Sequence, residues 1–379
     1  MGKKKKILVL AGTLRSLINF RGPLLFQMVK YGHTVIAAAP VDENFVEIKN
    51  ILLKIGVKLT TIPLARASVN PWHDLKSYLT LINLYRSIKP DIVFAYTVKP
   101  VIYGGIAARK VGGINFYPMI TGLGYAFTKS GGIKQRIIKS FVSFLYRQAL
   151  VAADTVIFHN PDDETLFKKL NIQSKKTPSA LVNGSGVDLV DFPFVSLPSS
   201  PVFLMLSRLL VDKGVREYVE AARKVKKKYP ETIFRLGGRL DKNPTSIKSA
   251  ELKDWVDEEV IEYLGTLLSV QAALAACKFY VLPSYREGTP RSVIEALATG
   301  RPIITTDVPG CRETVVHGKN GLLVAPRNSD ALAKAMIQLI ETCHGDIQRM
   351  GNKSFEIARD KYDVKNVNNK MLQIMRLSN

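Results

Sequence analysis

The stretch FYVLPSYREGTPRSVIEALATG, residues 279–300, reads as a buried strand, a short loop and a helix. Its apolar run at 279–282 is short and continuous, which is typical of a parallel strand covered on both faces. Pro290 suits the first helical position, where its missing N–H costs nothing, and Thr289 before it is a natural N-cap. A strand that leads directly into a helix indicates a βαβ unit.

The same alternation extends from this stretch in both directions. Further strands are expected at 6–12, 33–40, 57–64, 90–96, 201–209, 232–238 and 301–307, with helices at 22–32, 43–55, 73–88 and 215–229. This pattern predicts an α/β protein of two Rossmann-like domains, each a doubly wound parallel sheet, that face a cleft. The expected domains are 1–182 and 201–357, joined by a Gly-, Ser- and Pro-rich linker at 183–200. A C-terminal helix within 358–379 is expected to cross back to the first domain.

The composition narrows the possible partners. The chain has 379 residues, with 54 lysines and arginines against 32 acids and a net charge of +22. This excess predicts an anionic partner, which composition alone leaves open among nucleic acid, a phosphorylated ligand and an anionic membrane surface. Three scattered cysteines suggest neither zinc nor disulfides and fit a cytoplasmic location. We find no signal peptide and no apolar run near 18 residues.

Two carboxylates and two cations form the candidate site. The helix start at Pro290 offers free N–H groups to a diphosphate, and Gly288 lets a ligand approach the backbone. Glu287 in the loop and Glu295 on the polar helix face could each bind sugar hydroxyls, as a nucleoside diphosphate sugar requires. Arg208 and Lys213, five residues apart at a strand–helix turn, can neutralise two phosphates. Each of these residues alone is more often an ordinary solvated side chain.

Together these motifs resemble a known family. SRLLVDKG (207–214), GGRLDKNP (237–244), EGTPRSVIE (287–295) and NGSGVD (183–188) resemble the GT4 group of retaining glycosyltransferases, which have the GT-B fold. NFRGP (19–23), ARASVNP (65–71) and TGLGYAF (121–127) are similar to bacterial N-acetylgalactosaminyltransferases that act on diphosphoundecaprenol-linked sugars.

The resemblance implies a role for each matching residue. Glu287, Arg208 and Lys213 would be catalytic. The donor, a UDP-sugar, would be bound by Arg208, Lys213, Gly238, Arg239, Glu287, Gly288, Thr289, Pro290 and Glu295. Asn19, Arg21, Thr121 and Gly122 would form the acceptor loops of the N-terminal domain, facing a polyprenyl-diphosphate-linked saccharide. Many GT4 relatives carry a histidine near the reacting sugar, whereas this chain has Thr121 and Gly122 in that segment.

The resemblance also bears on metal ions and mechanism. No cofactor is expected, and the chain has no DxD motif, so a metal-bridged donor is not expected. Front-face substitution with retention follows from the family likeness.

A basic amphipathic segment at 131–148 predicts contact with an anionic membrane surface. On a helical wheel, one side carries Ile133, Ile137, Ile138, Phe141, Phe144 and Leu145, and the other Arg136, Lys139 and Arg147. Such a helix, with Lys134 at its start and Lys3 to Lys6 at the N-terminus, suits an interfacial binder on the inner face of the cell membrane. A core-facing helix with a solvated basic face is almost equally compatible with this pattern.

The sequence is also compatible with three other functions. A nucleic-acid-binding protein would explain the net charge but calls for basic residues interleaved with stacking aromatics, which we do not find. A UDP-sugar epimerase or hydrolase of the same fold would share the donor site without an acceptor. A non-catalytic peripheral scaffold would tolerate the loss of Glu287.

Overall fold

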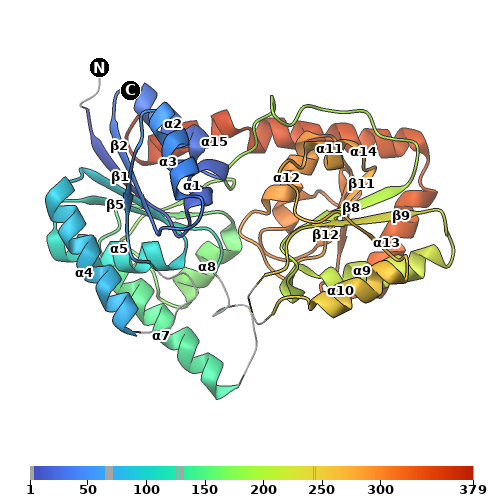
Figure 1. Cartoon of the computed structure of the whole chain (residues 1–379), viewed down its shortest axis with the longest axis horizontal. Coiled ribbons are helices and arrows are strands. Elements are labelled where there is room, and N and C mark those ends of the chain that lie inside the picture. Colours follow the sequence, from blue (N-terminus) through green and yellow to red (C-terminus); the bar gives the residue numbers. More distant parts are fainter. Residues whose placement is uncertain are drawn as a thin grey trace. The chain divides into compact units, whose positions relative to one another are not determined.

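The computed structural model describes residues 4–64, 71–123, 127, 132–241, 243 and 245–378, without the side chains of 71 and 133–135. The chain forms two compact units (Figure 1). Unit 1 comprises Met1–Ser185 and Lys365–Asn379, and unit 2 comprises Gly186–Val364. Most of ARASVNP, part of TGLGYAF and positions 242 and 244 of GGRLDKNP lie outside the described residues.

Unit 1 is built on a seven-stranded sheet in the order β3-β2-β1-β4-β5-β6-β7. The strands are β1 (Lys6–Leu10), β2 (Thr34–Ala39), β3 (Lys58–Thr61), β4 (Ile92–Tyr96), β5 (Asn115–Ile120), β6 (Val156–Phe158) and β7 (Ser179–Leu181). The helices are α1 (Leu14–Asn19), α2 (Gly22–Lys30), α3 (Phe45–Lys54), α4 (Pro71–Ile88), α5 (Val98–Val111), α7 (Ile133–Leu150), α8 (Pro161–Lys169) and α15 (Val364–Ile374).

The described strand pairs of this sheet are all parallel, so a helix must return the chain between neighbouring strands. Right-handed crossovers place helices on opposite faces according to the direction in which the chain moves along the sheet. One core accordingly contains residues of α1, α2, α3 and α15, and the other contains residues of α4, α5, α7 and α8. The C-terminal helix belongs to the first core, where Met371, Leu372 and Met375 are buried.

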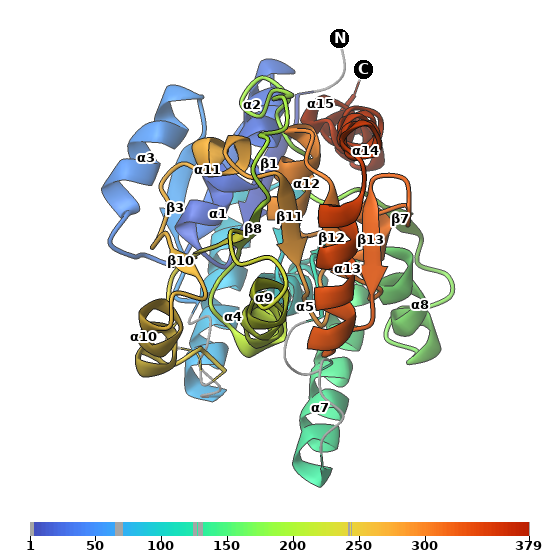
Figure 2. The ribbon, with the colours of Figure 1, turned by 90° about the vertical axis from the view of Figure 1, so that its right-hand side faces the viewer.

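Unit 2 is built on a six-stranded sheet in the order β10-β9-β8-β11-β12-β13. The strands are β8 (Val202–Leu206), β9 (Ile233–Gly237), β10 (Glu262–Tyr263), β11 (Phe279–Leu282), β12 (Ile303–Thr306) and β13 (Gly321–Val324). The helices are α9 (Val215–Lys226), α10 (Ser249–Asp257), α11 (Gln271–Ala275), α12 (Arg291–Ala298), α13 (Ser329–Glu341) and α14 (His344–Ile357), with short 3-10 turns at Val211–Lys213 and Arg312–Thr314 and a π-helical turn at Ala358–Tyr362. Figure 2 shows α9 and α13 side by side over one face of this sheet.

The domain bounds differ from the sequence-based expectation. Most of the predicted linker packs on unit 2, because Val187, Phe192 and Leu197 enter its hydrophobic core. Buried Arg301 fastens this segment: its Nη1 donates to the Cys277 carbonyl at 2.8 Å, and its Nη2 donates to the carbonyl of Val195. The chain therefore changes unit at 185/186, and it returns only after residue 364.

The predicted strands and helices are confirmed, and their parallel arrangement gives the expected doubly wound sheets. The expectation that the two domains face a cleft stays a prediction. Among the described residues, none of the helices combines the length and the apolar character that a membrane span needs.

Candidate active site

The candidate site of unit 2 lies where its strand order reverses. From β8 the chain moves to β9 on one side, and from β11 it moves to β12 on the other, while β8 and β11 are paired at the centre. Loops that leave such neighbouring strands at their carboxyl ends diverge and leave room for a ligand. Arg208 and Lys213 follow β8, and Glu287 follows β11. The topology therefore brings together two segments that lie far apart in the sequence.

Lys213 and Glu287 form an ion pair at this point. The Lys213 Nζ lies 2.5 Å from Glu287 Oε1, and the two side chains are only 16% and 14% exposed. The Ser284 hydroxyl donates to the same carboxylate oxygen at 2.8 Å, and the Glu287 N–H donates to the Pro309 carbonyl at 3.0 Å. A cation and a carboxylate are thus held at the mouth of the switch point, in surroundings where electrostatic interactions are stronger than in water.

Two glycines let the loops of this site approach one another. Gly214 has φ +74, and a Cβ there would lie 2.2 Å from the Pro283 carbonyl oxygen. Gly310 has φ +83, and its Cβ would lie 2.3 Å from the carbonyl oxygen of Glu287. Any side chain at either position would push away the loop that carries Glu287. Sequence reasoning missed Gly310, because nothing in its local sequence indicates which distant backbone it meets.

Tyr285 connects the same loop to the segment after β8. Its N–H donates to the Asp212 carbonyl at 2.9 Å, and its hydroxyl donates to Glu217 Oε1 at 2.6 Å. The guanidinium of Arg327 lies 4.6 Å from the centre of the Tyr285 ring. These contacts fix the spacing between Lys213 and Glu287. Tyr285 was also missed, although it lies two residues from a predicted site residue.

Arg208 has a carboxylate partner of its own. Its Nη1 lies 3.0 Å from Asp241 Oδ2, within the predicted motif after β9. Burial would raise the pKa of Asp241, but hydrogen bonds from Arg208 and from the Asn243 N–H outweigh it and leave that pKa below its usual value. Each of the two predicted cations is therefore held by a different acid.

Gly238 and Arg239 contact the end of β8 through their backbone. With φ +143 at Gly238, a Cβ would lie 1.7 Å from the Ser207 carbonyl oxygen. The Leu209 N–H donates to the Arg239 carbonyl at 3.1 Å. The two residues thus support the segment that carries Arg208, whereas a role in donor binding stays a prediction for both.

Helix α12 begins one residue later than the sequence predicted. Pro290 is its N-cap rather than its first residue, with φ −73 and ψ 111, and Thr289 is therefore not the cap. The extended ψ of Pro290 leaves its carbonyl free to accept from the N–H groups of Val293 and Ile294. Gly288 and Thr289 remain in the loop that leads to this helix start.

Glu295 is less exposed than its place on the polar helix face predicts. Its side chain is 12% exposed, and Arg291 Nε donates to its Oε1 at 2.7 Å. Thr299, four residues further along the same side of the helix, is also buried. Burial raises the pKa of Glu295, and the charge and hydrogen bond of Arg291 offset only part of this effect. A mostly buried carboxylate with one cation is thus available to accept hydrogen bonds from a ligand.

The four predicted N-terminal residues belong to unit 1. Asn19 ends α1, Arg21 precedes α2, and Thr121 and Gly122 follow β5. Arg21 is buried, and its Nη2 donates to the sulfur of Met119 at 2.8 Å. Its guanidinium also lies over the rings of Phe94 and Tyr96, at 5.7 and 5.2 Å from their centres. It therefore joins the first loop to the carboxyl ends of β4 and β5.

A histidine that sequence reasoning did not select lies near Arg21. His159 follows β6 and is partly buried, with both ring nitrogens out of contact with solvent, and burial together with the positive charge of Arg21 lowers its pKa to about 3. Its imidazole is therefore neutral at physiological pH.

Thr97 follows β4 with an unusual φ of 69, and a Cβ at Gly12 would lie 2.7 Å from its Oγ1. Strained backbone of this kind clusters at functional sites, and Gly12 and Thr97 lie where the strand order of unit 1 reverses.

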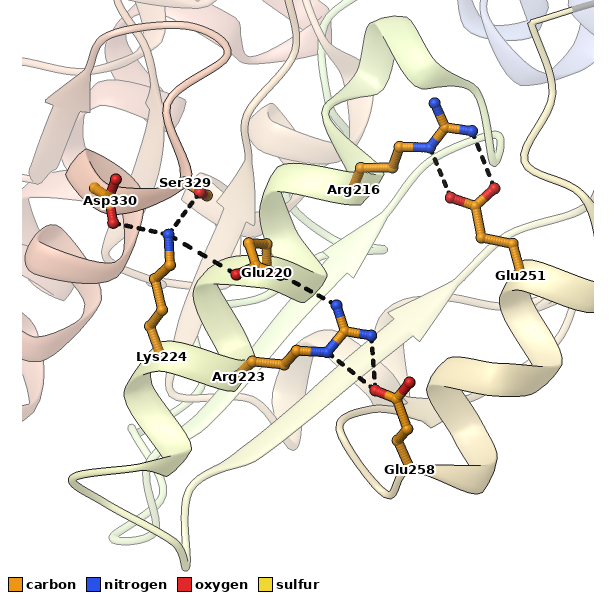
Figure 3. A network of polar contacts seen from close by, with 8 residues as sticks. All are labelled: Arg216, Glu220, Arg223, Lys224, Glu251, Glu258, Ser329 and Asp330. Carbon is orange, nitrogen blue, oxygen red and sulfur yellow. Dashed lines mark hydrogen bonds and ion pairs between the residues drawn. The ribbon is translucent and has the colours of Figure 1, made fainter.

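The positive charge of the chain is concentrated in unit 1. Its sequence has 29 lysines and arginines against nine acids, while unit 2 has 25 against 23. Unit 2 also pairs its charges internally, in a network across α9, α10 and the start of α13 (Figure 3). There Arg216 binds Glu251 at 2.6 Å, Arg223 binds Glu258 at 2.6 Å and Lys224 binds Asp330 at 2.7 Å. A net charge of +20 therefore belongs to unit 1 alone.

Two family models match the chain, one in each half. The model for glycosyl transferases group 1 matches residues 200–342, and the model for glycosyl transferase 4-like domains matches residues 30–160. The first match contains every predicted donor residue.

Two curated relatives match most of the chain. A N,N'-diacetylbacillosaminyl-diphospho-undecaprenol alpha-1,3-N-acetylgalactosaminyltransferase of Campylobacter jejuni is 27% identical over 340 residues, covering 86% of this chain and 87% of the relative. A UDP-Gal:alpha-D-GlcNAc-diphosphoundecaprenol alpha-1,3-galactosyltransferase of Escherichia coli is 26% identical over 300 residues, covering 76% of each chain.

Solved structures share the fold over almost the entire chain. Sucrose-phosphate synthase of Thermosynechococcus elongatus has a TM-score of 0.80 at 18% identity, with 98% of both chains covered. Anabaena HepE in complex with UDP has a TM-score of 0.76 at 18% identity, with 98% and 99% covered. With its two parallel-sheet units and its matches to both family models, the chain belongs to the GT4-like glycosyltransferases of GT-B fold.

Proposed function

We propose that the protein transfers N-acetylgalactosamine from a UDP-sugar to a saccharide linked to polyprenyl diphosphate, with retention of anomeric configuration, in bacterial glycan assembly. The observation that carries this proposal is the Lys213–Glu287 pair at the switch point of unit 2, where a nucleotide sugar is expected to bind. The choice of sugar is supported by the activity of the Campylobacter jejuni relative, and the choice of acceptor by the diphosphoundecaprenol-linked sugars on which both relatives act.

In this proposal unit 2 binds the donor and neutralises its leaving group. The bond between the anomeric carbon and the diphosphate oxygen breaks while the acceptor hydroxyl oxygen bonds to the same face of that carbon. The hydroxyl proton passes to an oxygen of the departing diphosphate. Lys213 and Arg208 stabilise the negative charge that develops there, Glu287 contacts the sugar and Glu295 accepts hydrogen bonds from the ribose hydroxyls. No metal ion or cofactor is required.

Unit 1 would then bind an anionic acceptor at an anionic surface. Its net charge of +20 suits both a diphosphate and the lipid headgroups around it. The predicted amphipathic segment 131–148 falls largely in α7, although residue 131 lies outside the described residues. On α7, Ile137, Phe141 and Phe144 are exposed, as an interfacial helix requires. We therefore place the protein at the cytoplasmic face of the cell membrane, as a peripheral protein.

A transfer assay tests the reaction. The purified chain is incubated with UDP-N-acetylgalactosamine, UDP-N-acetylglucosamine, UDP-galactose or UDP-glucose and a short-chain polyprenyl-diphosphate saccharide, with and without EDTA. We expect an α-linked product with UDP-N-acetylgalactosamine at a rate that EDTA does not change. Full turnover of the donor without any acceptor would instead indicate an epimerase or hydrolase. Duplex DNA binding that UDP does not affect would favour the nucleic-acid alternative.

Gly310→Ala should abolish most transfer. The new Cβ would displace the carbonyl of Glu287, and misplacement by about 1 Å can reduce a rate roughly 100-fold. The matched control is Gly318→Ala, since Gly318 has a similar φ of +76 but open space around it. Initial rates at saturating donor should fall far more for the first variant than for the second. Equal rates for the two would mean that the loop position does not matter for transfer.

Glu295→Gln should stabilise the free protein but weaken UDP binding. Because the folded-state pKa of Glu295 is raised, its contribution favours folding below the ordinary glutamate pKa and is lost as pH rises through the folded value. Glutamine does not ionise, so the variant does not lose stability as the pH rises. Its melting temperature should therefore exceed that of the parent at pH 7 and match it near pH 4. UDP affinity should fall about ten-fold, as expected when hydrogen bonds to a charged group are weakened. Unchanged affinity would remove Glu295 from the ribose site.

A further inference from the structure

Helices α4 and α7 lie on the same face of the unit 1 sheet, on either side of α5. The chain moves in one direction from β3 to β4, from β4 to β5 and from β5 to β6, so right-handed crossovers place all three helices together. Contacts agree with this, because α5 packs against both α4 and α7 (Figure 1).

Both outer helices are longer than the strands they cover. Each has 18 residues and spans about 27 Å, whereas the five residues of β4 span about 17 Å. Their C-terminal parts pack on the core, through Tyr85 in α4 and through Tyr146 and Leu150 in α7. Their N-terminal parts extend past the carboxyl edge of the sheet, and Figure 2 shows the end of α7 projecting there.

These projecting parts carry exposed apolar stripes. The residues are Trp72, Leu75 and Leu79 on α4 and Ile137, Phe141 and Phe144 on α7, each between 46% and 77% exposed. Spacings of three and four residues place each set on one side of its helix. The intervening helix α5 has no large apolar side chain of comparable exposure among its residues. The described surface therefore has two apolar ridges that point beyond the same edge of the sheet.

The charge around the ridges identifies what they fit. Residues 92–153 contain eight lysines and arginines and no aspartate or glutamate. Lys76 and Arg136 are exposed beside the stripes, and the nearby acid Asp74 forms an ion pair with Lys99 at 2.6 Å. Apolar side chains flanked by cations match the interface of an anionic bilayer, in which the headgroups are negative and the acyl chains lie just below.

We propose that α4 and α7 together form one membrane-docking surface, with both apolar stripes inserted among anionic lipids. This deepens the peripheral location given under the proposed function and rests on it. Docking through two ridges at the carboxyl edge of the sheet orients unit 1. A domain anchored by one helix could still rotate about the axis of that helix, whereas anchoring by two spaced helices prevents this rotation. The edge that holds Thr97, Arg21 and His159 thereby comes to face the membrane that carries the acceptor.

Vesicle flotation with paired variants tests the two-helix surface. The vesicles consist either of phosphatidylcholine alone, which is neutral overall, or of phosphatidylcholine with about 30% phosphatidylglycerol, which is anionic. Leu75→Ser with Leu79→Ser changes α4, and Phe141→Ser with Phe144→Ser changes α7. The matched control is Val46→Ser with Leu53→Ser on α3, whose exposed apolar residues lie on the opposite face. Each variant is also assayed for UDP binding and for transfer to a water-soluble short-chain acceptor.

We expect the α4 pair and the α7 pair each to reduce binding to the anionic vesicles about ten-fold or more, and the control pair to leave it unchanged. UDP binding and transfer to the soluble acceptor should stay at the parental level in all three. Loss of binding in the α7 pair alone would overturn the two-helix surface while leaving the transferase proposal intact. The two-helix surface would also be overturned if light scattering showed that the parent protein is a dimer, and if both variant pairs gave monomers whose vesicle binding was unchanged.

Discussion

Lys213→Ala should lose most transfer activity, with kcat reduced about 100- to 1,000-fold, the usual effect of removing one preorganised electrostatic donor. The Lys213 side chain is only 16% exposed, so its charge acts in surroundings where water screens it weakly. The diphosphate would then leave from a site with one cation fewer. UDP affinity should fall as well, because UDP carries the same phosphates as the transition state. Steady-state kinetics and calorimetric UDP titration measure the two effects.

Two further variants separate this role from a general effect of charge. Lys224→Ala removes another lysine of unit 2, one that binds Asp330 at the surface, and should retain the parental rate. Lys213→Arg keeps the charge but replaces a compact ammonium by a wide planar fork, so it should recover only part of the activity. Parental kcat in Lys213→Ala, within a few-fold, would contradict a role for this residue at the leaving phosphate.

The sequence predicts most of the fold because its periodicity is strong. Runs such as 7–10 and 202–206 are short and apolar, and each is followed by an amphipathic helical segment, so strand, helix and parallel pairing follow together. Boundaries were less predictable. Pro290 satisfies the rules for a first helical residue equally well as for an N-cap, and only its ψ of 111 decides between them. The sequence also did not indicate that most of the linker packs on unit 2, because the core residues Phe192 and Leu197 lie among Gly, Ser and Pro residues.

The candidate site was predictable in part, for a related reason. Lys213 and Glu287 are recognisable because each sits in a motif after a strand, and the switch point then brings them together. Asp241 and Gly310 were not selected, since their importance depends on Arg208 and on the Glu287 carbonyl, which are distant in sequence. His159 was overlooked for the same reason: its proximity to Arg21 arises from the order of β5 and β6 in the sheet.

Glu287→Ala should change UDP affinity and the rate of sugar transfer in opposite directions. In the free protein the Glu287 carboxylate forms an ion pair with the Lys213 ammonium, with 2.5 Å between Oε1 and Nζ. UDP must therefore compete with this carboxylate for the cation. Removing the carboxylate frees Lys213 for the diphosphate, and UDP should bind as tightly as before or more tightly. Transfer should nevertheless fall about 100-fold or more, because the proposed contact to the donor sugar is lost and the Lys213 side chain is no longer held in place.

This opposite response distinguishes a catalytic pair from a structural one. If the pair only held the loops together, Lys213→Ala and Glu287→Ala would weaken UDP binding alike. Glu251→Ala, which breaks the exposed pair with Arg216, controls for the loss of an acid from unit 2 and should change neither quantity. Calorimetric titration with UDP and with the intact UDP-sugar then shows the sign for each ligand. A Glu287→Ala protein that binds UDP more weakly than the parent, or that transfers at the parental rate, would refute the role assigned to this carboxylate.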